Sequence, residues 1–429
     1  MPSGKAARKA KGKTEGKAEG KLYQPPTGGR DLLPLDVVQK RWIEDRLEQI
    51  FHRWGYHRII TSTVETMDTL MAGGAIDRIE VIELQMSQLG GQRLGLRPEL
   101  TASIARAAVT RLASVTYPQR LYYNANVFRR SPKGSQGSQQ EYHQAGIELL
   151  GASGLMADAE AVLLASDCLS ELNLTDVNIV LGEAALTYSL LSAFPEDIRE
   201  TIRHHIAALD LVALQEMALS DSLQNLVVRL MDLRGEPQAV LTKLAKFDLS
   251  DEQREIVGRL KSLVELLKLE RDRGIPLPSI VLDLSLIRPY DYYTGIVFEV
   301  ISSTHLQLGQ GGRYDDLLSE YDAAGATGFP GIGFVLNIEQ LHQELTPSGQ
   351  LPSKTPPSDW LIVPQDESAA AAALAYAQKA RQSKNTVRVE MSLAVGQSAD
   401  EIRAIARKRN IARIAWISPE GLPDIEIVH

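Results

Sequence analysis

Residues 288–317 read RPYDYYTGIVFEVISSTHLQLGQGGRYDDL, and this stretch decides the fold prediction. Its β-branched and aromatic run from Ile296 to Ile301 predicts a strand, because such side chains pack well on a pleated surface. The motif DYYT lies just before this strand, and the motif GQGGRYDDL follows it. Tyrosine hydroxyls, acids and an arginine therefore stand in strand-and-turn contexts, which is the pattern of a polar pocket.

Two earlier segments carry the same residue types. One is LRPELTA at 96–102, and the other covers 127–151, beginning with VFRR and ending with EYHQAGIELLG. Taken singly, each segment is explained equally well by solvated charges and ordinary glycine turns. The four segments together, drawn from distant parts of the sequence, indicate one polar pocket.

The surrounding sequence divides into a large interrupted domain and a small one. Apolar residues at helical spacing predict a helix from Val37 to Trp54, and β-branched residues predict a strand from Tyr56 to Val64. Pro and Ser are dense in a later linker. The predicted units are a disordered basic tail at 1–20, a large domain at 21–344 with a helical insertion at about 184–273, the linker at 345–358 and a small α/β domain at 359–429.

The composition excludes several classes of protein. The chain has 429 residues, of which 44% are hydrophobic and 23% charged, and its net charge is −8. No run approaches the roughly 20 apolar residues of a membrane span. The negative charge argues against a main role in gripping nucleic acid, because clustered Lys and Arg dominate such binding. Cys168 is the only cysteine, which excludes an intrachain disulfide and a multi-cysteine metal site and fits the reducing cytoplasm. We expect no metal and no cofactor.

The four segments resemble the histidyl-tRNA synthetase family of class II aminoacyl-tRNA synthetases. They match the family patterns LRPEGTA, HQxGxExxG, RGLDYYT and GGRYD, and the resemblance runs from Gly28 to the linker. It implies an α+β fold with an antiparallel sheet flanked by helices, a helical insertion before DYYT, and a homodimer. In that family the ammonium and imidazole of histidine are held by residues that match a set present here in full: Glu99, Thr101, Gln144, Glu148, Tyr292 and Tyr293.

This set is chemically suited to histidine. Carboxylates balance an α-ammonium, and an acid, an amide and a tyrosine hydroxyl together satisfy both imidazole nitrogens. Arg288 matches the family's catalytic arginine beside the substrate carboxylate, so it joins the predicted histidine site. Pro289 and Tyr290 replace the Gly-Leu that follows this arginine in the family, which leaves its orientation open. Asp291 is left out of the set, because a structural role explains it equally well.

The positions that would hold ATP depart from the family pattern. Adenylation needs arginines on the triphosphate and a carboxylate on adenine, because charge develops on the transferring phosphate. The family's FRxE reads FRRS at 128–131, its GRxREF reads GSQQEY at 137–142, and its closing arginine is replaced by Gln340. Losing one such contact costs about 3 kcal/mol in the transition state, so several losses should abolish turnover. The predicted degenerate ATP site consists of Arg129, Ser131, Ser138, Gln140 and Gln340.

The small C-terminal domain supports the same interpretation. It resembles a truncated anticodon-binding domain, about one strand-helix cycle shorter than the family's and without an obvious basic face. Stacking on anticodon bases would require exposed aromatic side chains. Trp360 and Trp416 instead lie in apolar strand contexts that predict core positions. We therefore predict that tRNA is not a partner.

Two functional hypotheses follow. An intact histidine pocket beside a degenerate ATP pocket resembles the non-catalytic branch of the family, the regulatory subunits that partner the short-form catalytic subunit of ATP phosphoribosyltransferase. This resemblance implies that the partner performs catalysis in the first step of histidine biosynthesis, that L-histidine is the feedback effector, and that a homodimer sits within a hetero-oligomer. The alternative is an enzyme, either a divergent histidyl-tRNA synthetase or a paralogue that activates histidine for another acceptor. Arg288 is its best support, and ATP-pyrophosphate exchange distinguishes the two.

Overall fold

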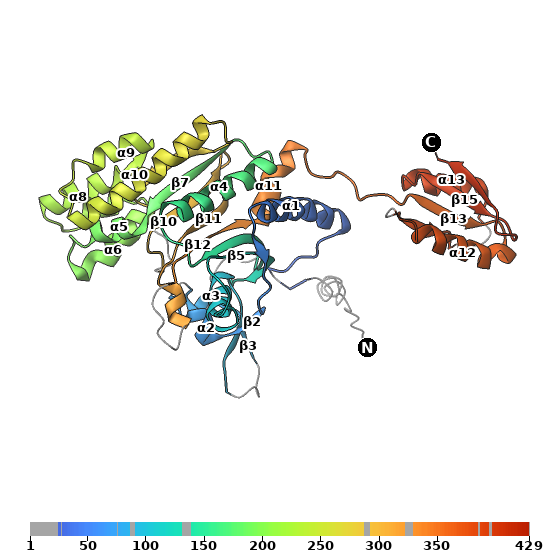
Figure 1. Ribbon diagram of the computed structural model, residues 1–429, viewed down its shortest axis with the longest axis horizontal. Helices are drawn as coiled ribbons and strands as arrows, with labels where there is room; N and C mark the ends of the chain where they lie inside the picture. The colour runs from blue at the N-terminus through green and yellow to red at the C-terminus, as the bar shows by residue number, and fades with distance from the viewer. Residues whose placement is uncertain are drawn as a thin grey trace, which may run out of the picture. The chain divides into compact units, whose positions relative to one another are not determined.

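The computed structural model describes residues 25–26, 28–74, 76–85, 91–130, 139–286, 292–321, 329–384, 387–393 and 397–428. The chain folds into two compact units, Met1–Leu351 and Pro352–His429 (Figure 1). The division falls within the segment 345–358, where Pro and Ser are dense. The predicted tail at 1–20 lies outside the described residues.

Nine strands form the main sheet of the large unit: β1 His57–Arg58, β5 Gln119–Phe128, β6 Glu141–Leu150, β7 Val177–Glu183, β8 Arg234–Gly235, β9 Ser279–Asp283, β10 Ile296–Ser302, β11 Gln307–Arg313 and β12 Gly331–Asn337. Their order is β1-β5-β6-β12-β11-β10-β7-β9-β8. The strands from β5 to β7 in this order pair antiparallel, whereas β1 runs parallel to β5 and β9 parallel to β7. The centre of the sheet is therefore antiparallel, with parallel pairs towards both edges.

Four helices cover one face of this sheet (Figure 1): α1 Pro34–Arg53, α4 Leu155–Glu171, α10 Asp251–Asp272 and α11 Ile338–Leu345. In α1 the apolar residues Ile43, Leu47 and Ile50 recur at helical spacing and are buried. They join strand residues such as Phe334 in the largest hydrophobic core. Burial of each such side chain contributes about 1.5–3 kcal/mol, so this face holds the sheet in place.

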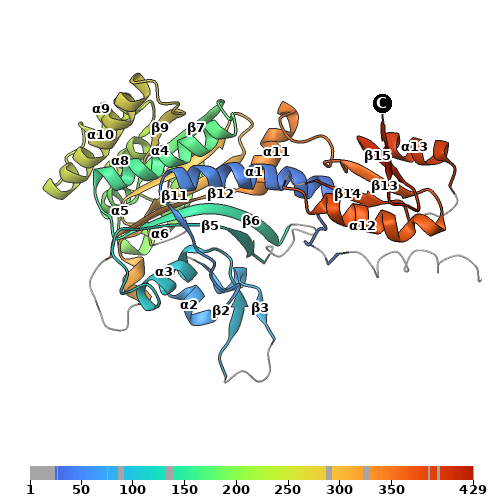
Figure 2. The ribbon, with the colours of Figure 1, turned by 45° about the vertical axis from the view of Figure 1, so that its right-hand side comes forward.

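The opposite face of the sheet carries smaller elements (Figure 2): β2 Val64–Thr66, α2 Met67–Met71, the 3-10 turn η2 Arg78–Glu80, β3 Glu83–Leu84, β4 Leu94–Leu96, α3 Thr101–Thr110 and the 3-10 turn η3 Leu317–Tyr321. The strands β2, β4 and β3 form a separate antiparallel sheet. A second core joins Ile104 of α3 to Tyr123 and Val297 of the main sheet. This core fixes the start of α3 above the central strands.

The segment 184–273 is mostly helical and consists of α5 Ala184–Leu191, α6 Glu196–Ala207, α7 Leu211–Glu216, α8 Asp221–Met231, α9 Pro237–Leu244 and α10, with β8 between α8 and α9. Helix α10 begins with a capping box, in which Ser250 Oγ accepts from Gln253 N at 3.1 Å and Gln253 Oε1 accepts from Ser250 N at 2.9 Å. None of the helices in the described ranges is long and apolar enough to cross a membrane.

The small unit has a four-stranded sheet with one helix on each face. In spatial order its strands are β14 Val389–Met391, β13 Trp360–Pro364, β15 Arg413–Ile417 and β16 Pro423–Ile427, and its helices are α12 Ala370–Arg381 and α13 Ala399–Lys408. Strand β13 is parallel to both neighbours, while β15 and β16 form an antiparallel pair. Trp360 packs against the core under α12 and Trp416 against the core under α13, and both remain half-buried.

The strand predicted from Tyr56 to Val64 is largely wrong. Only its two ends are strands, as parts of β1 and β2. Ile59 N still donates to Tyr122 O at 2.9 Å, but the chain then leaves the main sheet, and Ile60 is 80% exposed. Strand propensity reflects how well a side chain packs on a half-buried sheet. After Ile59 the chain has left the main sheet, so its β-branched side chains have no such surface to pack on.

Cys168 lies in α4 and points into the large core. Its side chain is fully buried, and burial raises the pKa of its thiol well above the usual range. The residue is therefore a small core side chain with little thiolate character.

Candidate functional site

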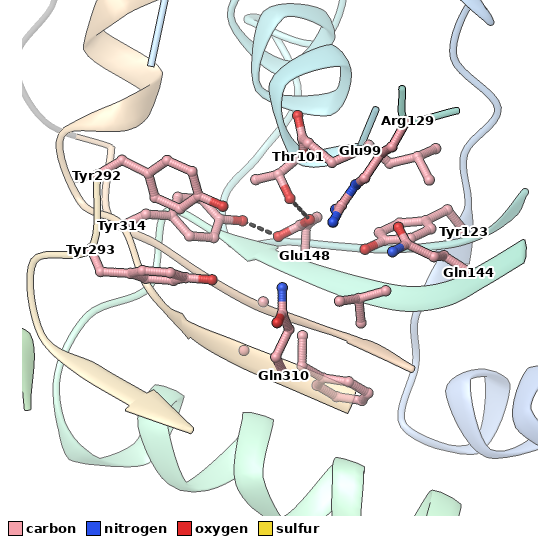
Figure 3. Close-up of a pocket in the computed structure, with 15 residues that line it drawn as sticks. Glu99, Thr101, Tyr123, Arg129, Gln144, Glu148, Tyr292, Tyr293, Gln310 and Tyr314 are labelled. Atoms are coloured by element: carbon pink, nitrogen blue, oxygen red, sulfur yellow. Dashed lines mark hydrogen bonds between the residues drawn. The ribbon is translucent and has the colours of Figure 1, made fainter. Parts of the chain in front are cut away.

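A polar pocket opens between the start of α3 and the central strands of the main sheet (Figure 3). Strands β5, β6, β11 and β12 supply its floor and walls, and the segment before β10 closes one side. Its lining residues are Glu99, Leu100, Thr101, Tyr123, Arg129, Gln144, Glu148, Tyr292, Tyr293, Gln310, Gly311, Tyr314, Gly333, Phe334 and Val335. Residues more than 200 positions apart in the sequence thus meet in one site.

Glu148 lies on β6 at the centre of the pocket and is 1% exposed. Thr101 Oγ1 donates to its Oε1 at 2.8 Å, and the hydroxyl of Tyr314 donates to its Oε2. Gly333 faces Glu148 from the neighbouring strand, where a Cβ would collide with Oε2. Two donors and a glycine floor therefore hold the carboxylate in one orientation.

The surroundings of Glu148 also control its charge. Burial raises the pKa of Glu148 to about 8, because the carboxylate is poorly solvated there, while the bonds from Tyr314 and Thr101 lower it and the nearby Glu99 raises it. Glu148 therefore carries a proton in much of the population at neutral pH. A ligand N–H would favour the carboxylate form by giving it another donor.

Glu99 comes just before α3 and holds the first turn of this helix. Its carboxylate accepts hydrogen bonds from Ala102 N, at 2.8 Å, and from Thr101 N. Free N–H groups make a helix N-terminus favourable for an anion. Burial nevertheless raises the pKa of Glu99. Each carboxylate oxygen has a second acceptor site, so this group can also bind a ligand cation.

Arg129 follows β5 and points into the pocket beside Glu99 (Figure 3). Its Nε donates to Pro98 O at 3.0 Å, which fixes the plane of the guanidinium. The pocket thus combines two carboxylates with one guanidinium, which suits a ligand that carries both an ammonium and a carboxylate. No three His, Cys, Asp or Glu side chains in the described part of the chain are placed to hold a metal ion.

Gln144 and two tyrosines complete the predicted set. Gln144 is 6% exposed, and its Nε2 donates to Asn337 Oδ1 at 3.4 Å, so its carbonyl oxygen remains the acceptor for a ligand. The rings of Tyr292 and Tyr293 lie 4.7 Å apart, and Tyr292 meets Tyr314 edge-on at 5.9 Å. These rings form the side of the pocket opposite Arg129 (Figure 3).

The structure brings together six of the seven residues predicted to bind histidine: Glu99, Thr101, Gln144, Glu148, Tyr292 and Tyr293. Arg288, the seventh, lies outside the described residues, as does its neighbour Asp291. The shared pocket is an observation, whereas the role of each residue towards histidine stays a prediction.

The residues predicted as a degenerate ATP site are more scattered. Arg129 lines the pocket, but Gln140 and Gln340 are not among the lining residues. Gln140 pairs through its backbone with Arg129 and Gly28 just before β6, and Gln340 lies in α11. Ser131 and Ser138 lie outside the described residues.

Three polar lining residues were missed by the sequence prediction. Tyr314 belongs to the GGRYD motif, which was recognised without assigning the tyrosine a role. Tyr123 could have been found from the alternation of β5, since Tyr122 packs under the helices and Tyr123 faces the other side. Gln310 lies in the recognised motif GQGGRYDDL but was assigned no role, because its place in the pocket depends on the register of β10, β11 and β12.

An antiparallel central sheet, helices packed on one face and a polar pocket on the other define a class II synthetase-like protein. A histidyl-tRNA synthetase family model matches residues 28–341, which is most of the chain. The predicted α+β fold is confirmed by solved structures. The chain has a TM-score of 0.76 and 25% identity with a Bacillus halodurans structure described as an ATP phosphoribosyltransferase regulatory subunit/histidyl-tRNA synthetase, covering 92% of this chain and 98% of that one.

Curated relatives define the branch. A protein of Nostoc punctiforme named ATP phosphoribosyltransferase regulatory subunit is 57% identical over 408 residues, covering 94% of this chain and 99% of the relative. A protein of Trichormus variabilis with the same name is 55% identical over 410 residues, covering 95% and 99% respectively. The chain belongs to this histidyl-tRNA synthetase-like family of ATP phosphoribosyltransferase regulatory subunits.

Proposed function

We propose that the chain binds L-histidine in the pocket around Glu148 and is the histidine-sensing, non-catalytic subunit of a hetero-oligomeric ATP phosphoribosyltransferase. The observation that carries the proposal is the buried carboxylate of Glu148, which Thr101 and Tyr314 hold at the centre of the pocket. The same pocket contains a second acid and a guanidinium, so it offers partners for both charges of an amino acid. Such a group suits an imidazole N–H, while Glu99 and Arg129 suit the ammonium and the carboxylate of the same amino acid.

The proposal assigns catalysis to a separate short-form catalytic subunit, which performs the first step of histidine biosynthesis. Support comes from the names of the relatives and from the glutamines at 140 and 340, which lack the charge that phosphate binding needs. Feedback inhibition requires that histidine bind the inactive arrangement of the complex more tightly than the active one. A homodimer of this chain within the hetero-oligomer, located in the cytoplasm, belongs to the same proposal.

Titration calorimetry with L-histidine and no ATP tests the binding step. We expect saturable binding by the full chain, and absence of both heat and thermal shift at millimolar histidine would contradict the proposal. Mixing the chain with the short-form catalytic subunit of its own organism tests the assignment. The rate of phosphoribosyl transfer should rise on mixing and fall again when histidine is added. An unchanged rate on mixing would contradict the proposed regulatory role.

One observation favours the alternative of a histidine-activating enzyme, because Arg129 lines the pocket as a phosphate-binding arginine would. Histidine-dependent ATP-pyrophosphate exchange decides between the two functions. We expect no exchange from the unmodified chain, since Gln140 and Gln340 stand where the family pattern has arginines and carry no charge to meet that of a triphosphate. Exchange at a rate usual for synthetases would favour the enzyme.

A further inference from the structure

Gln310 precedes the GGRYD motif and projects from β11 into the pocket (Figure 3). Its backbone pairs with Glu299 of β10 on one side and with Val335 of β12 on the other. Val335 packs in the core on the pocket side of the sheet, so the side chain of Gln310 shares this face. The amide is therefore part of the pocket floor.

The neighbours of Gln310 fix which way its amide points. A register shift between Val300 and Ile301 brings Gln307 next to Gln310. Gln307 Nε2 donates to Glu299 Oε1 at 3.1 Å and to Gln310 Oε1 at 3.2 Å. A carboxylate only accepts hydrogen bonds, so the NH₂ group of Gln307 must be the end that points to Glu299. The same NH₂ group also donates to Gln310, so the end of Gln310 that points to Gln307 must be its oxygen. The NH₂ of Gln310 is left facing the pocket (Figure 3).

Gln310 on β11 and Glu148 on β6 lie on opposite sides of the pocket floor, with strand β12 between them. Glu148 is opposite Gly333 on β12, and Gly333 is opposite Gly312 on β11, two residues beyond Gln310. Neighbouring strands lie about 4.8 Å apart, so the two backbone positions are about 10 Å apart or more. The glycines have no side chains of their own, and the ring of Tyr293 lies against Gly312 while the carboxylate of Glu148 lies against Gly333. The amide NH₂ of Gln310, which donates, and the carboxylate of Glu148, which accepts, thus lie on opposite sides of the pocket floor.

We propose that Gln310 is a specificity-determining residue that donates a hydrogen bond to the bare nitrogen of a neutral imidazole ring whose N–H is bound by Glu148. The inference rests on the proposed histidine site. Neutral imidazole offers one donor and one acceptor nitrogen, whereas imidazolium offers two donors. The amide NH₂ cannot accept, so an imidazolium would place a donor against a donor. The hydroxyl of Tyr293 beside it can donate or accept and does not discriminate.

Other ionisable groups around the ligand do not make this selection. Glu99 at the start of α3 and Arg129 after β5 carry opposite charges, while Glu299 on β10 is turned to Gln307. Tyr123, Tyr293 and Tyr314 are buried, and burial raises the pKa of Tyr123 and of Tyr314. Glu99 and Glu148 alone would favour a cationic ring. The positive charge of Arg129 opposes this preference only through its field, whereas Gln310 opposes it through a direct hydrogen bond to the ring.

Ring-nitrogen chemical shifts of bound ¹⁵N-labelled L-histidine report the protonation state directly. With the full unmodified chain at pH 8 we expect one protonated and one bare, hydrogen-bonded nitrogen. In Gln310→Glu the new carboxylate can accept, so both nitrogens should be protonated when the ligand is bound near pH 6. A doubly protonated ring bound to the unmodified chain at pH 8 would overturn the inference.

Calorimetry with the same variants supplies the second readout. Affinity of the unmodified chain should rise from pH 6 to pH 8, and Gln310→Glu should reverse this trend. Gln310→Ala should bind about tenfold more weakly at pH 8, the value of one hydrogen bond. Gln307→Leu removes the hydrogen bond that orients the Gln310 amide, so its affinity for histidine should fall less than that of Gln310→Ala. The exposed control Gln378→Glu should keep the full affinity.

The outcomes separate the two proposals. If the unmodified chain binds no histidine, the proposed function and the inference both fail. If it binds histidine and folded Gln310→Ala matches it at both pH values, the function stands and the inference is wrong. Thermal melting of each variant shows whether it is folded, and Gln307→Leu keeps the test valid if a substitution at Gln310 unfolds the chain.

Discussion

Strand β6 and the residue just before it lie in two regions that differ in chemistry. Inside the pocket its residues Gln144 and Glu148 have fixed hydrogen-bond partners on other elements. Just before the strand, Gln140 is held only through its backbone in the described contacts. The next strand repeats the contrast, because Gly333 of β12 supports Glu148 whereas Gln340, beyond the strand, does not line the pocket.

Under the proposed function, this difference separates the groups for amino-acid binding from the positions predicted for phosphate binding. The pocket residues depend on one another, since Thr101, Tyr314 and Gly333 all determine the position of a single carboxylate. Residues 140 and 340 do not share these contacts. Substitutions at positions such as 140 and 340 can therefore change charge outside the pocket without moving the groups around Glu148.

The largest expected effect comes from Glu148→Ala, which tests whether the pocket depends on this carboxylate. A hydrogen bond to a buried charged group contributes about 1.5–3 kcal/mol, so affinity for histidine should fall at least tenfold in calorimetry. Activation of the catalytic subunit should persist, because the proposal assigns assembly to surfaces outside the pocket. Glu141→Ala, at the exposed start of the same strand, is the matched control. Loss of activation in a folded Glu148→Ala protein would show that sensing and assembly are not separable.

The next largest expected effect is a loss of stability on substitution of Gly333, the glycine that faces Glu148. In Gly333→Ala the added methyl group meets Glu148 Oε2 and the carbonyl of Ile147, and overpacking of this kind costs about 1–3 kcal/mol. Urea unfolding should show this loss together with weaker histidine binding. Gly258→Ala is the control, because Gly258 lies in α10 with no atom within 4 Å of an added methyl group and alanine favours helix by up to about 1 kcal/mol. Equal stability of the two variants would contradict a close contact beneath Glu148.

The third effect, which is small over any one pH unit, is a pH dependence of stability. The pKa of Glu148 is about 8 in the folded chain, against an ordinary value of 4.5. Between these values the folded chain keeps a proton that the unfolded chain has lost, so its stabilising contribution is complete below pH 4.5 and is lost as pH rises to about 8. The slope approaches about 1.4 kcal/mol per pH unit at most.

Glu148→Gln isolates this contribution from that of Glu183, whose pKa burial also raises to about 8. Urea unfolding of the variant between pH 5.5 and 8 should lose stability less steeply than the unmodified chain. Identical slopes would show that Glu148 ionises normally in the folded protein.

Much of the pocket could be predicted from the sequence because its residues sit in local motifs. Glu99 and Thr101 stand two positions apart in LRPELTA, and Gln144 and Glu148 are four apart on one strand, so a shared face follows from strand alternation. The resemblance supplied the fact that these separate segments meet. Residues alone would have indicated a polar pocket without its ligand.

The rest depended on tertiary contacts. Gln310 enters the pocket because of how three strands are aligned and because of a register shift beside it, and neither leaves a local mark in the sequence. The Tyr56–Val64 prediction was largely wrong for the same reason, since a β-branched run becomes a strand only where a partner edge is present. Local composition identified the candidate side chains. The pairing of distant segments determined which of them line the pocket and which segments form strands.

The single cysteine has a practical consequence for labelling. Cys168 is fully buried and its thiol pKa is raised, so alkylating dyes that attack thiolates should leave the folded unmodified chain nearly unlabelled. Any cysteine introduced on the surface then becomes the sole attachment point without prior removal of a native thiol. A fluorophore placed at an exposed position such as Ser222 or Gln378 would then report on its own unit as histidine is added, against an almost silent background.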